Sequence, residues 1–341
     1  MMPDMRTPTM REVAALAGVS IKTVSRFVNG DETVSPAIAE RVRAAIDETG
    51  YRRNDLARSL RPGQRSTTLA LLVGDLTNPF YGSIANGVMG VARAHGHNVV
   101  LASSDEDPEA ERRGIDDLLG QRVAGLLIVP GAMDYGYLGR EVAQGTPVVF
   151  LDRPALGLDA DTVLLDNHGG ARKATEHLIA AGHRRIGVVV AASYHTTGRR
   201  LDGYLEAMRA AFGEVDEALI ARLEHGTRAE AEEAAAELLA LPPARRPTAL
   251  FTTTNFLTHG ALRAMGPGLG PGQGPALVGF DDFPFADLLP TPVTVVSGDA
   301  FEMGREAARL LLARIDGESG PPRRVELGTV LTPRGSGELT P

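Results

Sequence analysis

Apolar side chains near the start of the chain repeat at the three- and four-residue spacing of short helices, in two runs separated by Gly18. The first run consists of Val13, Leu16 and Ala17, and the second of Val24 and Val28. Glycine readily adopts the left-handed backbone of a tight turn. The pattern therefore predicts two short helices joined at this glycine.

Polar residues mark where these helices begin. Thr9 and Glu12 have the spacing of a capping box, and Ser20 can cap the second helix. The pair Ser35-Pro36 predicts the start of a third helix, which extends to Asp47 or Glu48. We expect an all-α head over residues 1–52.

From Thr68 onward, short apolar runs alternate with longer amphipathic stretches. The predicted strands are residues 69–73, 98–102, 125–129, 148–151, 185–190, 220–224, 249–253, 276–280 and 293–296, with a tail at 325–331. The predicted helices are residues 81–95, 108–120, 135–144, 169–181, 198–212, 227–240, 256–265 and 300–316. Such alternation is typical of parallel βαβ units. Residues 67–341 are therefore expected to form a doubly wound α/β domain.

The α/β pattern falls into two similar sets, which predict two lobes. A second set of elements begins near residue 162, and the last elements cross back. We assign about 67–161 and 293–324 to the first lobe, and about 162–292 and 325–341 to the second.

A linker over residues 53–66 separates the head from the α/β domain. Its first half could form two helical turns from an Asn54 cap before Pro62 stops them. A helix this short is marginal in water, so we expect it to order only with a partner.

With the apolar positions of the second helix turned inward, Ile21, Lys22, Ser25, Arg26 and Asn29 face outward, where a helix can enter a major groove. Residues 9–30 resemble the DNA-binding end of the lactose-repressor/galactose-repressor (LacI/GalR) family, whose Asp/Glu-Val-Ala-x-x-Ala-Gly-Val-Ser-x-x-Thr-Val-Ser-Arg-x-x-Asn pattern they match almost without a gap. The resemblance implies a DNA-binding role for Thr9, Ser20, Ile21, Lys22, Thr23, Ser25, Arg26, Asn29, Ser35, Asn54, Arg58 and Leu60. It also makes the linker a hinge helix that pairs with its dimer mate and inserts Leu60 into the minor groove.

The resemblance extends to about residue 335 and implies the two-lobed fold of periplasmic sugar-binding proteins. Polar and aromatic residues follow several predicted strands, at the end of a parallel sheet where ligands bind. The run Asp75 to Tyr81 is similar to the family's Asp-x-x-Asn-Pro-Phe-Phe/Tyr, and Asp152-Arg153 matches its Asp-Arg pair. The expected effector-binding residues are Asn78, Phe80, Tyr81, Asp152, Arg153, Tyr194, Arg200, Asn255, Phe256 and Asp281. Carboxylates accept hydrogen bonds from hydroxyl groups, guanidinium groups donate to them, and aromatic rings offer apolar faces to a sugar ring, so these side chains suit polyols.

Two positions depart from the family pattern. The chain has Asn255-Phe256 where Asn-Asp is common, and Gly298 where Gln or Arg is frequent. Both make one side of the expected pocket less polar, so an effector with an apolar or aromatic part is plausible.

Charge is distributed unevenly along the chain. Residues 1–66 carry eleven basic and eight acidic side chains, whereas the whole chain has a net charge of −8. A basic head on an acidic body directs DNA to one end of the protein.

Signatures of other classes are missing from the sequence. It has no cysteine, no phosphate loop and no Gly-x-Ser-x-Gly or His-Glu-x-x-His motif, so we expect no enzyme activity, no cofactor and no metal. The absence of an apolar leader and of long apolar runs favours a cytoplasmic protein that does not bind membranes.

These observations predict a homodimeric transcription regulator. The most consistent interpretation is a repressor that a small-molecule effector, a sugar or related metabolite, releases from a pseudo-palindromic operator in double-stranded DNA. A corepressor-dependent regulator remains the main alternative, and a transport solute-binding protein is the other.

Overall fold

The structure, a computed structural model, describes residues 8–28, 31, 33–51, 66–131, 134–191, 194–270, 272 and 274–341. The chain divides into two compact units, Met1–Ser66 and Thr67–Pro341. Each unit has its own hydrophobic core.

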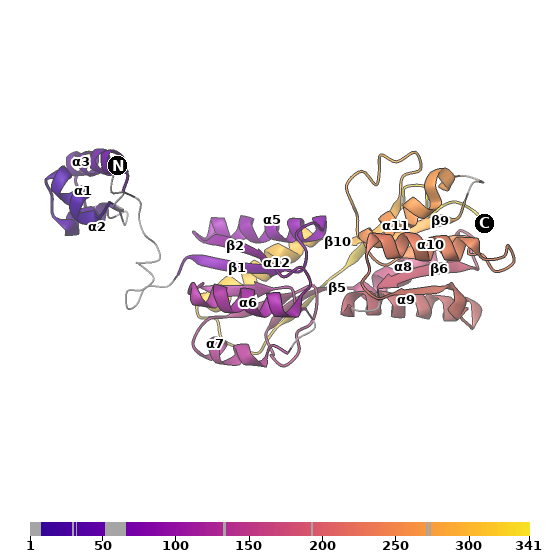
Figure 1. The fold of residues 1–341 in the computed structure, drawn as a ribbon. Helices are drawn as coiled ribbons and strands as arrows, with labels where there is room; N and C mark the ends of the chain where they lie inside the picture. The colour runs from indigo at the N-terminus through magenta and orange to yellow at the C-terminus, as the bar shows by residue number, and fades with distance from the viewer. Residues whose placement is uncertain are drawn as a thin grey trace. The chain divides into compact units, whose positions relative to one another are not determined.

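The first unit contains three helices, α1 (Met10–Ala17), α2 (Ile21–Val28) and α3 (Pro36–Thr49) (Figure 1). The predicted capping box is present at Thr9 and Glu12, and Gly18 ends α1 with a φ of 61°. The Ser20 hydroxyl accepts a hydrogen bond of 3.1 Å from the amide of Thr23. The predicted helix-turn-helix is therefore confirmed.

Leu16 does not belong to this core, contrary to the periodicity argument. Its side chain is 47% exposed, whereas Val13, Ala14 and Ala17 are buried. Successive residues of a helix are rotated by about 100°, so a stripe centred on those three residues leaves Leu16 on its flank.

The second unit consists of two lobes, each built on a six-stranded sheet. The first sheet has the order β11-β5-β4-β3-β1-β2, and the second β12-β10-β9-β8-β6-β7. The strands of the first sheet are β1 (Thr68–Val73), β2 (Asn98–Ser103), β3 (Gly125–Ile128), β4 (Val148–Leu151), β5 (Asp161–Leu165) and β11 (Arg324–Leu327). Those of the second are β6 (Ile186–Ala191), β7 (Ile220–Leu223), β8 (Ala249–Thr252), β9 (Ala276–Phe280), β10 (Thr294–Gly298) and β12 (Thr329–Thr332). Every pairing is parallel except that of β12 with β10.

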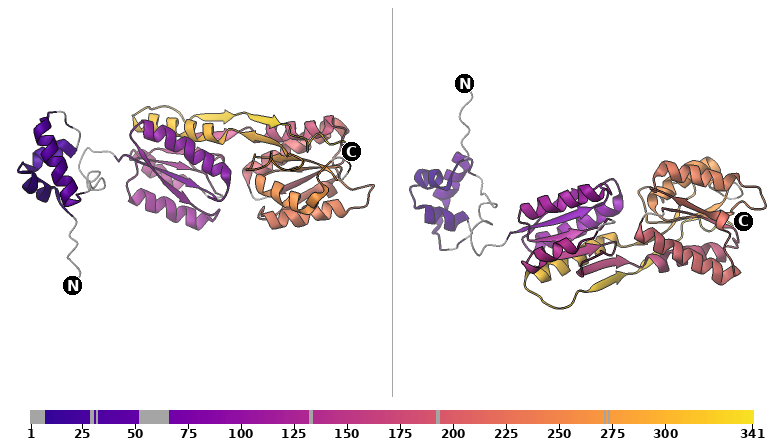
Figure 2. Two further views of the ribbon diagram at one scale, coloured as in Figure 1. Left: turned by 90° about the horizontal axis from the view of Figure 1, so that it is seen from above. Right: turned by 60° about the horizontal axis from the view of Figure 1, so that its bottom comes forward.

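Helices cover both faces of each sheet, as Figure 2 shows. The first lobe carries α5 (Pro79–Ala94), α6 (Pro108–Gly120), α7 (Gly139–Ala143) and α12 (Ala300–Ile315), and the second carries α8 (Asn167–Ala180), α9 (His195–Phe212), α10 (Arg228–Ala240) and α11 (Asn255–Met265). Two apolar clusters lie in each lobe. Strands buried on both faces are the reason that the sequence shows short continuous apolar runs.

The predicted lobe boundaries are wrong at three places. The strand at 161–165 pairs with β4 and so belongs to the first lobe, and the strand at 294–298 belongs to the second. The predicted tail at 325–331 is two strands, β11 in the first sheet and β12 in the second. The chain therefore crosses between the lobes after β5, β10 and β11. The sheet that a strand joins depends on its hydrogen-bond partners, which an apolar run does not specify.

Candidate functional site

The second helix of the head presents a polar face. Ile21 is 45% exposed, Lys22 is exposed, and Ser25 is partly exposed. Arg26 is also exposed, and its Nε lies 3.5 Å from a carboxylate oxygen of Asp31. A half-exposed pair of this kind is weak, so the guanidinium can exchange it for another acceptor.

Other predicted DNA-binding residues have local roles at the helix ends. Thr9 and Ser20 are caps, and Thr23 shares a side-chain hydrogen bond of 2.9 Å with Ser20. Ser35 occupies the N-cap position of α3 without a side-chain cap bond. Asn29, Asn54, Arg58 and Leu60 lie outside the described residues.

A cavity of about 740 Å³ lies between the two lobes of the second unit. Nine of the ten predicted effector residues line it: Asn78, Phe80, Tyr81, Asp152, Arg153, Tyr194, Arg200, Phe256 and Asp281. Its size falls within the range of roughly 300–1,000 Å³ found for small-molecule sites. The structure thus brings into one cavity residues that are separated by about 200 positions in the chain.

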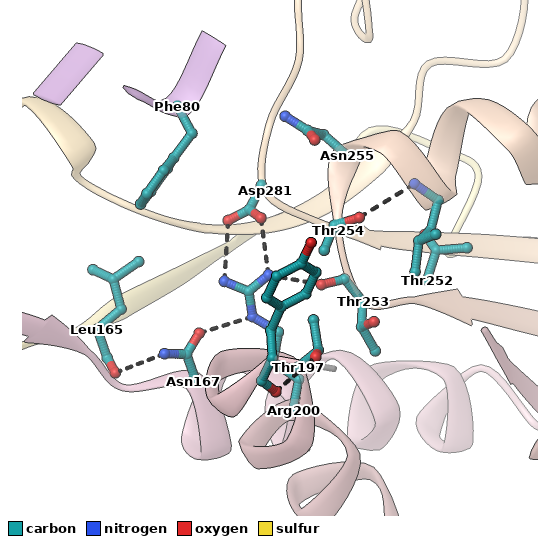
Figure 3. A network of polar contacts seen from close by, with 12 residues as sticks. Phe80, Leu165, Asn167, Thr197, Arg200, Thr252, Thr253, Thr254, Asn255 and Asp281 are labelled. Atoms are coloured by element: carbon teal, nitrogen blue, oxygen red, sulfur yellow. Dashed lines mark hydrogen bonds and ion pairs between the residues drawn. The ribbon is translucent and has the colours of Figure 1, made fainter. Parts of the chain in front are cut away.

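Arg200 lies at the centre of a network of polar contacts in this site (Figure 3). Its Nε donates to Asn167 at 2.8 Å, and one terminal nitrogen donates to the Thr253 carbonyl at 2.7 Å and to Asp281 at 2.9 Å. The guanidinium also lies 3.7 Å from the ring centroid of Phe280. Arg200 and Asp281 are both buried, so each charge depends on the other.

Two aspartates occupy matching positions in the two lobes. Asp152 follows β4 and Asp281 follows β9, and both have positive φ angles, 65° and 67°. Non-glycine residues in this region carry strain, which is often found at functional sites. Burial raises the pKa of Asp152 and of Asp281 above the ordinary value, while the neighbouring guanidinium groups oppose that rise. Both residues line the cavity.

Asn255 is the predicted residue that does not line the cavity. It is fully buried, and its Nδ2 donates to Oδ1 of Asn78 at 2.9 Å, which links α11 of the second lobe to the start of α5 in the first. The same Asn78 oxygen accepts from the amide of Phe80 and caps α5. Its neighbour Thr254, at the cap of α11, lines the cavity instead. Asn255 thus joins the two lobes in this structure, and its direct contact with a ligand stays a prediction.

Aromatic rings from both lobes line the same cavity. Phe80 and Tyr81 belong to α5 and make an edge-on contact, with ring centroids 5.4 Å apart. Tyr194 precedes α9, and its ring lies 4.6 Å from the Arg153 guanidinium of the other lobe. Phe256 stacks under Arg228 at 4.2 Å. These rings supply the apolar faces that a sugar ring needs.

The sequence analysis missed several lining residues: Asp75, Thr77, Asp105, Glu106, Thr196, Thr197, His225, Thr227 and Thr254. Asp105 and Glu106 lie two and three residues beyond Ser103, the last residue of β2. The rule that ligands bind beyond the carboxyl ends of parallel strands could have found them.

Among the described residues, no helix is long and apolar enough to cross a membrane. The same part of the chain contains no group of three or more acidic or histidine side chains arranged to hold a metal ion.

A helical head with an exposed polar helix, followed in the same chain by a two-lobed domain with a cavity between its lobes, defines a class of protein: the DNA-binding regulators that respond to small molecules. Comparison with known proteins identifies the family. Residues 9–54 match the model of the bacterial regulatory proteins of the lacI family, and residues 66–330 match that of periplasmic binding proteins and the sugar-binding domain of the LacI family.

Relatives that match almost the whole chain belong to the same family. The transcriptional regulator CelR of Thermobifida fusca is 39% identical over 342 residues, which covers 97% of this chain and 99% of CelR. A solved complex of CelR with cellobiose is 36% identical, with a TM-score of 0.70 over 96% of this chain and 99% of that one. The Lac repressor dimer bound to operator and an anti-inducer is 26% identical, with a TM-score of 0.83 over 98% of this chain and 100% of that one.

The chain belongs to the LacI family of bacterial transcriptional regulators. It is a DNA-binding transcription regulator rather than an enzyme.

Proposed function

We propose that this regulator is a cytoplasmic homodimer that represses transcription from a pseudo-palindromic operator and is released when a sugar or related metabolite binds between its lobes. The observation that carries the proposal is the cavity itself, because its aromatic and charged side chains come from both lobes. A ligand that contacts both lobes stabilises one arrangement of them over others.

The ten predicted effector residues divide into two roles in this proposal. The nine that line the cavity contact the ligand, and Asn255 connects the two lobes through its hydrogen bond to Asn78. Asp152 is suited to accept hydroxyl hydrogens, since its buried carboxylate makes no hydrogen bond within the described residues.

DNA recognition is assigned to the head. Ile21, Lys22, Ser25 and Arg26 are placed in the major groove, and Thr9, Ser20, Thr23 and Ser35 are placed against the phosphates. Asn29, Asn54, Arg58 and Leu60 complete the predicted set. The exposure of the α2 face supports this assignment.

Exposed apolar side chains support association with a second copy. Val100 and Leu101 lie on the edge strand β2, and Phe285 and Leu288 lie between β9 and β10 with exposed fractions of 71% and 72%. Large exposed apolar side chains often mark interaction surfaces. Two heads on one dimer bind two half-sites as a bivalent unit, which raises affinity without new contacts.

Effector binding and operator binding are then coupled through the linker. The linker leads directly into β1, which begins at Thr68, and β1 lies in the lobe that the ligand engages. A coupling of about 1–3 kcal/mol is typical and must be reciprocal.

The test uses an operator selected from a random pool of palindromic DNA. Fluorescence anisotropy measures its affinity for the full chain with and without neutral sugars, beginning with cellobiose because a similar regulator has been solved with it. We expect one sugar to weaken operator binding roughly 5- to 150-fold. A ligand that strengthens binding would instead establish the corepressor alternative, and the absence of any response across sugars and nucleosides would refute the effector assignment.

A further inference from the structure

Arg153 lines the cavity, yet its terminal nitrogens are fully engaged within the protein. One donates to Glu106 at 2.7 Å and to the Pro130 carbonyl at 3.3 Å. The other donates to Glu106 at 2.8 Å and to the Tyr81 hydroxyl at 3.0 Å. Each terminal nitrogen carries two hydrogens, so all four are in use. The guanidinium therefore has no terminal N–H left for a ligand.

The backbone around Glu106 is shaped to hold its carboxylate against Arg153. Asp105 and Glu106 are consecutive non-glycine residues with positive φ angles, 51° and 58°. The amide of Glu106 donates to the carbonyl of Gly74 at 3.1 Å. A Cβ on Gly74 would lie 2.1 Å from the Glu106 carboxylate, so the side chain fits only because that position is glycine. The local strain is compensated by the two-point contact with Arg153.

Arg200, the other guanidinium of the cavity, is also occupied. It donates to Asn167, Thr253 and Asp281. Asp152 remains as a buried carboxylate that faces the cavity. The second terminal nitrogen of Arg200 makes one contact, of 3.5 Å, with the same Asp281 carboxylate. A ligand with a phosphate or carboxylate group would find both guanidinium groups of the cavity already paired with carboxylates, Arg153 with Glu106 and Arg200 with Asp281, and would meet the charge of Asp152 as well.

We propose that Glu106 sets the charge class of the effector: by occupying Arg153, it makes the cavity select an uncharged polyhydroxylated ligand over an anionic sugar. This inference rests on the proposed function, because it concerns the effector cavity. Without the Glu106 charge, Arg153 becomes an open bidentate site for phosphate or carboxylate. Glu106 is thus a specificity-determining residue that acts through Arg153.

The first test needs no knowledge of the effector. Glu106→Gln keeps the size and shape of the side chain, removes its charge and frees part of Arg153. The matched control is Glu109→Gln on the exposed surface of α6, which removes the same charge from a pair with Arg113. Sulfate is titrated against each full-length protein at constant ionic strength, and thermal unfolding is followed. We expect sulfate affinity to rise at least tenfold in Glu106→Gln and to be unchanged in the control.

Equal sulfate responses in the wild type, Glu106→Gln and Glu109→Gln would overturn the proposal. Glu106→Ala gives a second measurement, because it opens Arg153 completely. It should bind sulfate at least as tightly as Glu106→Gln.

The second test uses sugar pairs that differ only in one carboxylate: glucose with glucuronate, and cellobiose with cellobiouronate. The wild type should prefer the neutral member by at least tenfold, and Glu106→Gln should lose or reverse that preference. If Glu106 were only structural, the variant would weaken both members equally and leave their ratio unchanged, which would refute the proposal. If no neutral sugar affects operator binding by the wild type, the proposed effector class fails, while the sulfate result still decides the role of Glu106.

Discussion

The buried pair of Arg200 and Asp281 allows a quantitative prediction about the second lobe. The two side chains are only 4% and 11% exposed, and they meet at 2.9 Å. Arg200→Met keeps the aliphatic stem but leaves the Asp281 carboxylate buried without its partner. Removal of one partner from a buried pair costs about 3–5 kcal/mol. Since native domains are stable by about 5–15 kcal/mol, this loss is a large fraction of the total.

The double variant Arg200→Met/Asp281→Asn should be more stable than Arg200→Met alone, because no unpaired charge remains buried. Urea unfolding of the full chain, followed by far-ultraviolet circular dichroism, measures the free energies. Hydrogen exchange of β9, which ends beside Asp281, localises the effect.

The loss should also depend on pH. Burial raises the pKa of Asp281 and Arg200 opposes that rise, so removal of Arg200 raises this pKa further above its unfolded value. A carboxylate whose pKa is raised in the folded state does not lower the free energy of unfolding below its pKa in the unfolded chain, which is about 4. The destabilisation grows as pH increases from that value toward the pKa of the folded state. Arg200→Met should therefore lose more free energy of unfolding, relative to the wild type, at neutral pH than near pH 4. Two results would refute this reasoning. One is a loss of less than about 1 kcal/mol in the free energy of unfolding of Arg200→Met, and the other is a loss in the double variant equal to the sum of the losses in the two single variants.

Three further predictions concern other parts of the chain. Arg26→Ala should weaken operator binding by about 1–3 kcal/mol and weaken nonspecific DNA binding less. If anisotropy titrations show equal losses of affinity for both DNAs, Arg26 contacts phosphate and does not read a base. Burial acts to raise the pKa of Asp161, but the ion pairs with Arg314 at 2.8 Å and Arg323 at 2.9 Å outweigh it and lower this pKa to about 2. The ionised carboxylate should therefore contribute about 2 kcal/mol to the free energy of unfolding above pH 4, and this contribution should be lost as pH falls toward 2. In urea unfolding, the stability of Asp161→Asn should change less with acid pH than that of the wild type, and parallel profiles would show that these ion pairs do not stabilise the fold. Gly87→Ala should destabilise the first lobe, because its Cβ would lie 2.1 Å from the Phe301 carbonyl of α12; an unchanged thermal midpoint would show that α5 and α12 can separate freely.

The sequence determined the local elements and the identity of the head. The capping box at Thr9, the turn at Gly18 and the Pro at the start of α3 are short-range signals, and the structure contains each of them. Most strands and helices of the α/β unit follow the apolar periodicity within a few residues, but β5 (Asp161–Leu165) was not among the predicted strands. The stretch predicted as a helix at 135–144 is shorter, a 3₁₀ turn at Gly136–Leu138 followed by α7. These features depend on neighbours a few positions apart, and such interactions can be read directly from the chain.

The sequence also indicated the position of the cavity and nine of its lining residues, but not how its charges are paired. Asp152, Arg153, Arg200 and Asp281 were expected as ligand contacts, and all four line the cavity. Only the structure shows that Glu106 occupies Arg153. The contact joins residues 47 positions apart, and no local pattern encodes a partner at that separation.

Tertiary structure alone decided the lobe boundaries and the position of Asn255. The strands at 161–165, 294–298 and 324–327 have the same apolar character whichever sheet they join. Asn255 makes a hydrogen bond with Asn78, 177 residues away, which joins the two lobes. In each case the outcome depends on which hydrogen-bonding groups meet after the chain has crossed between lobes. That choice is made by the packing of the whole unit, because a strand or an amide side chain satisfies its hydrogen bonds equally well with several partners in the chain.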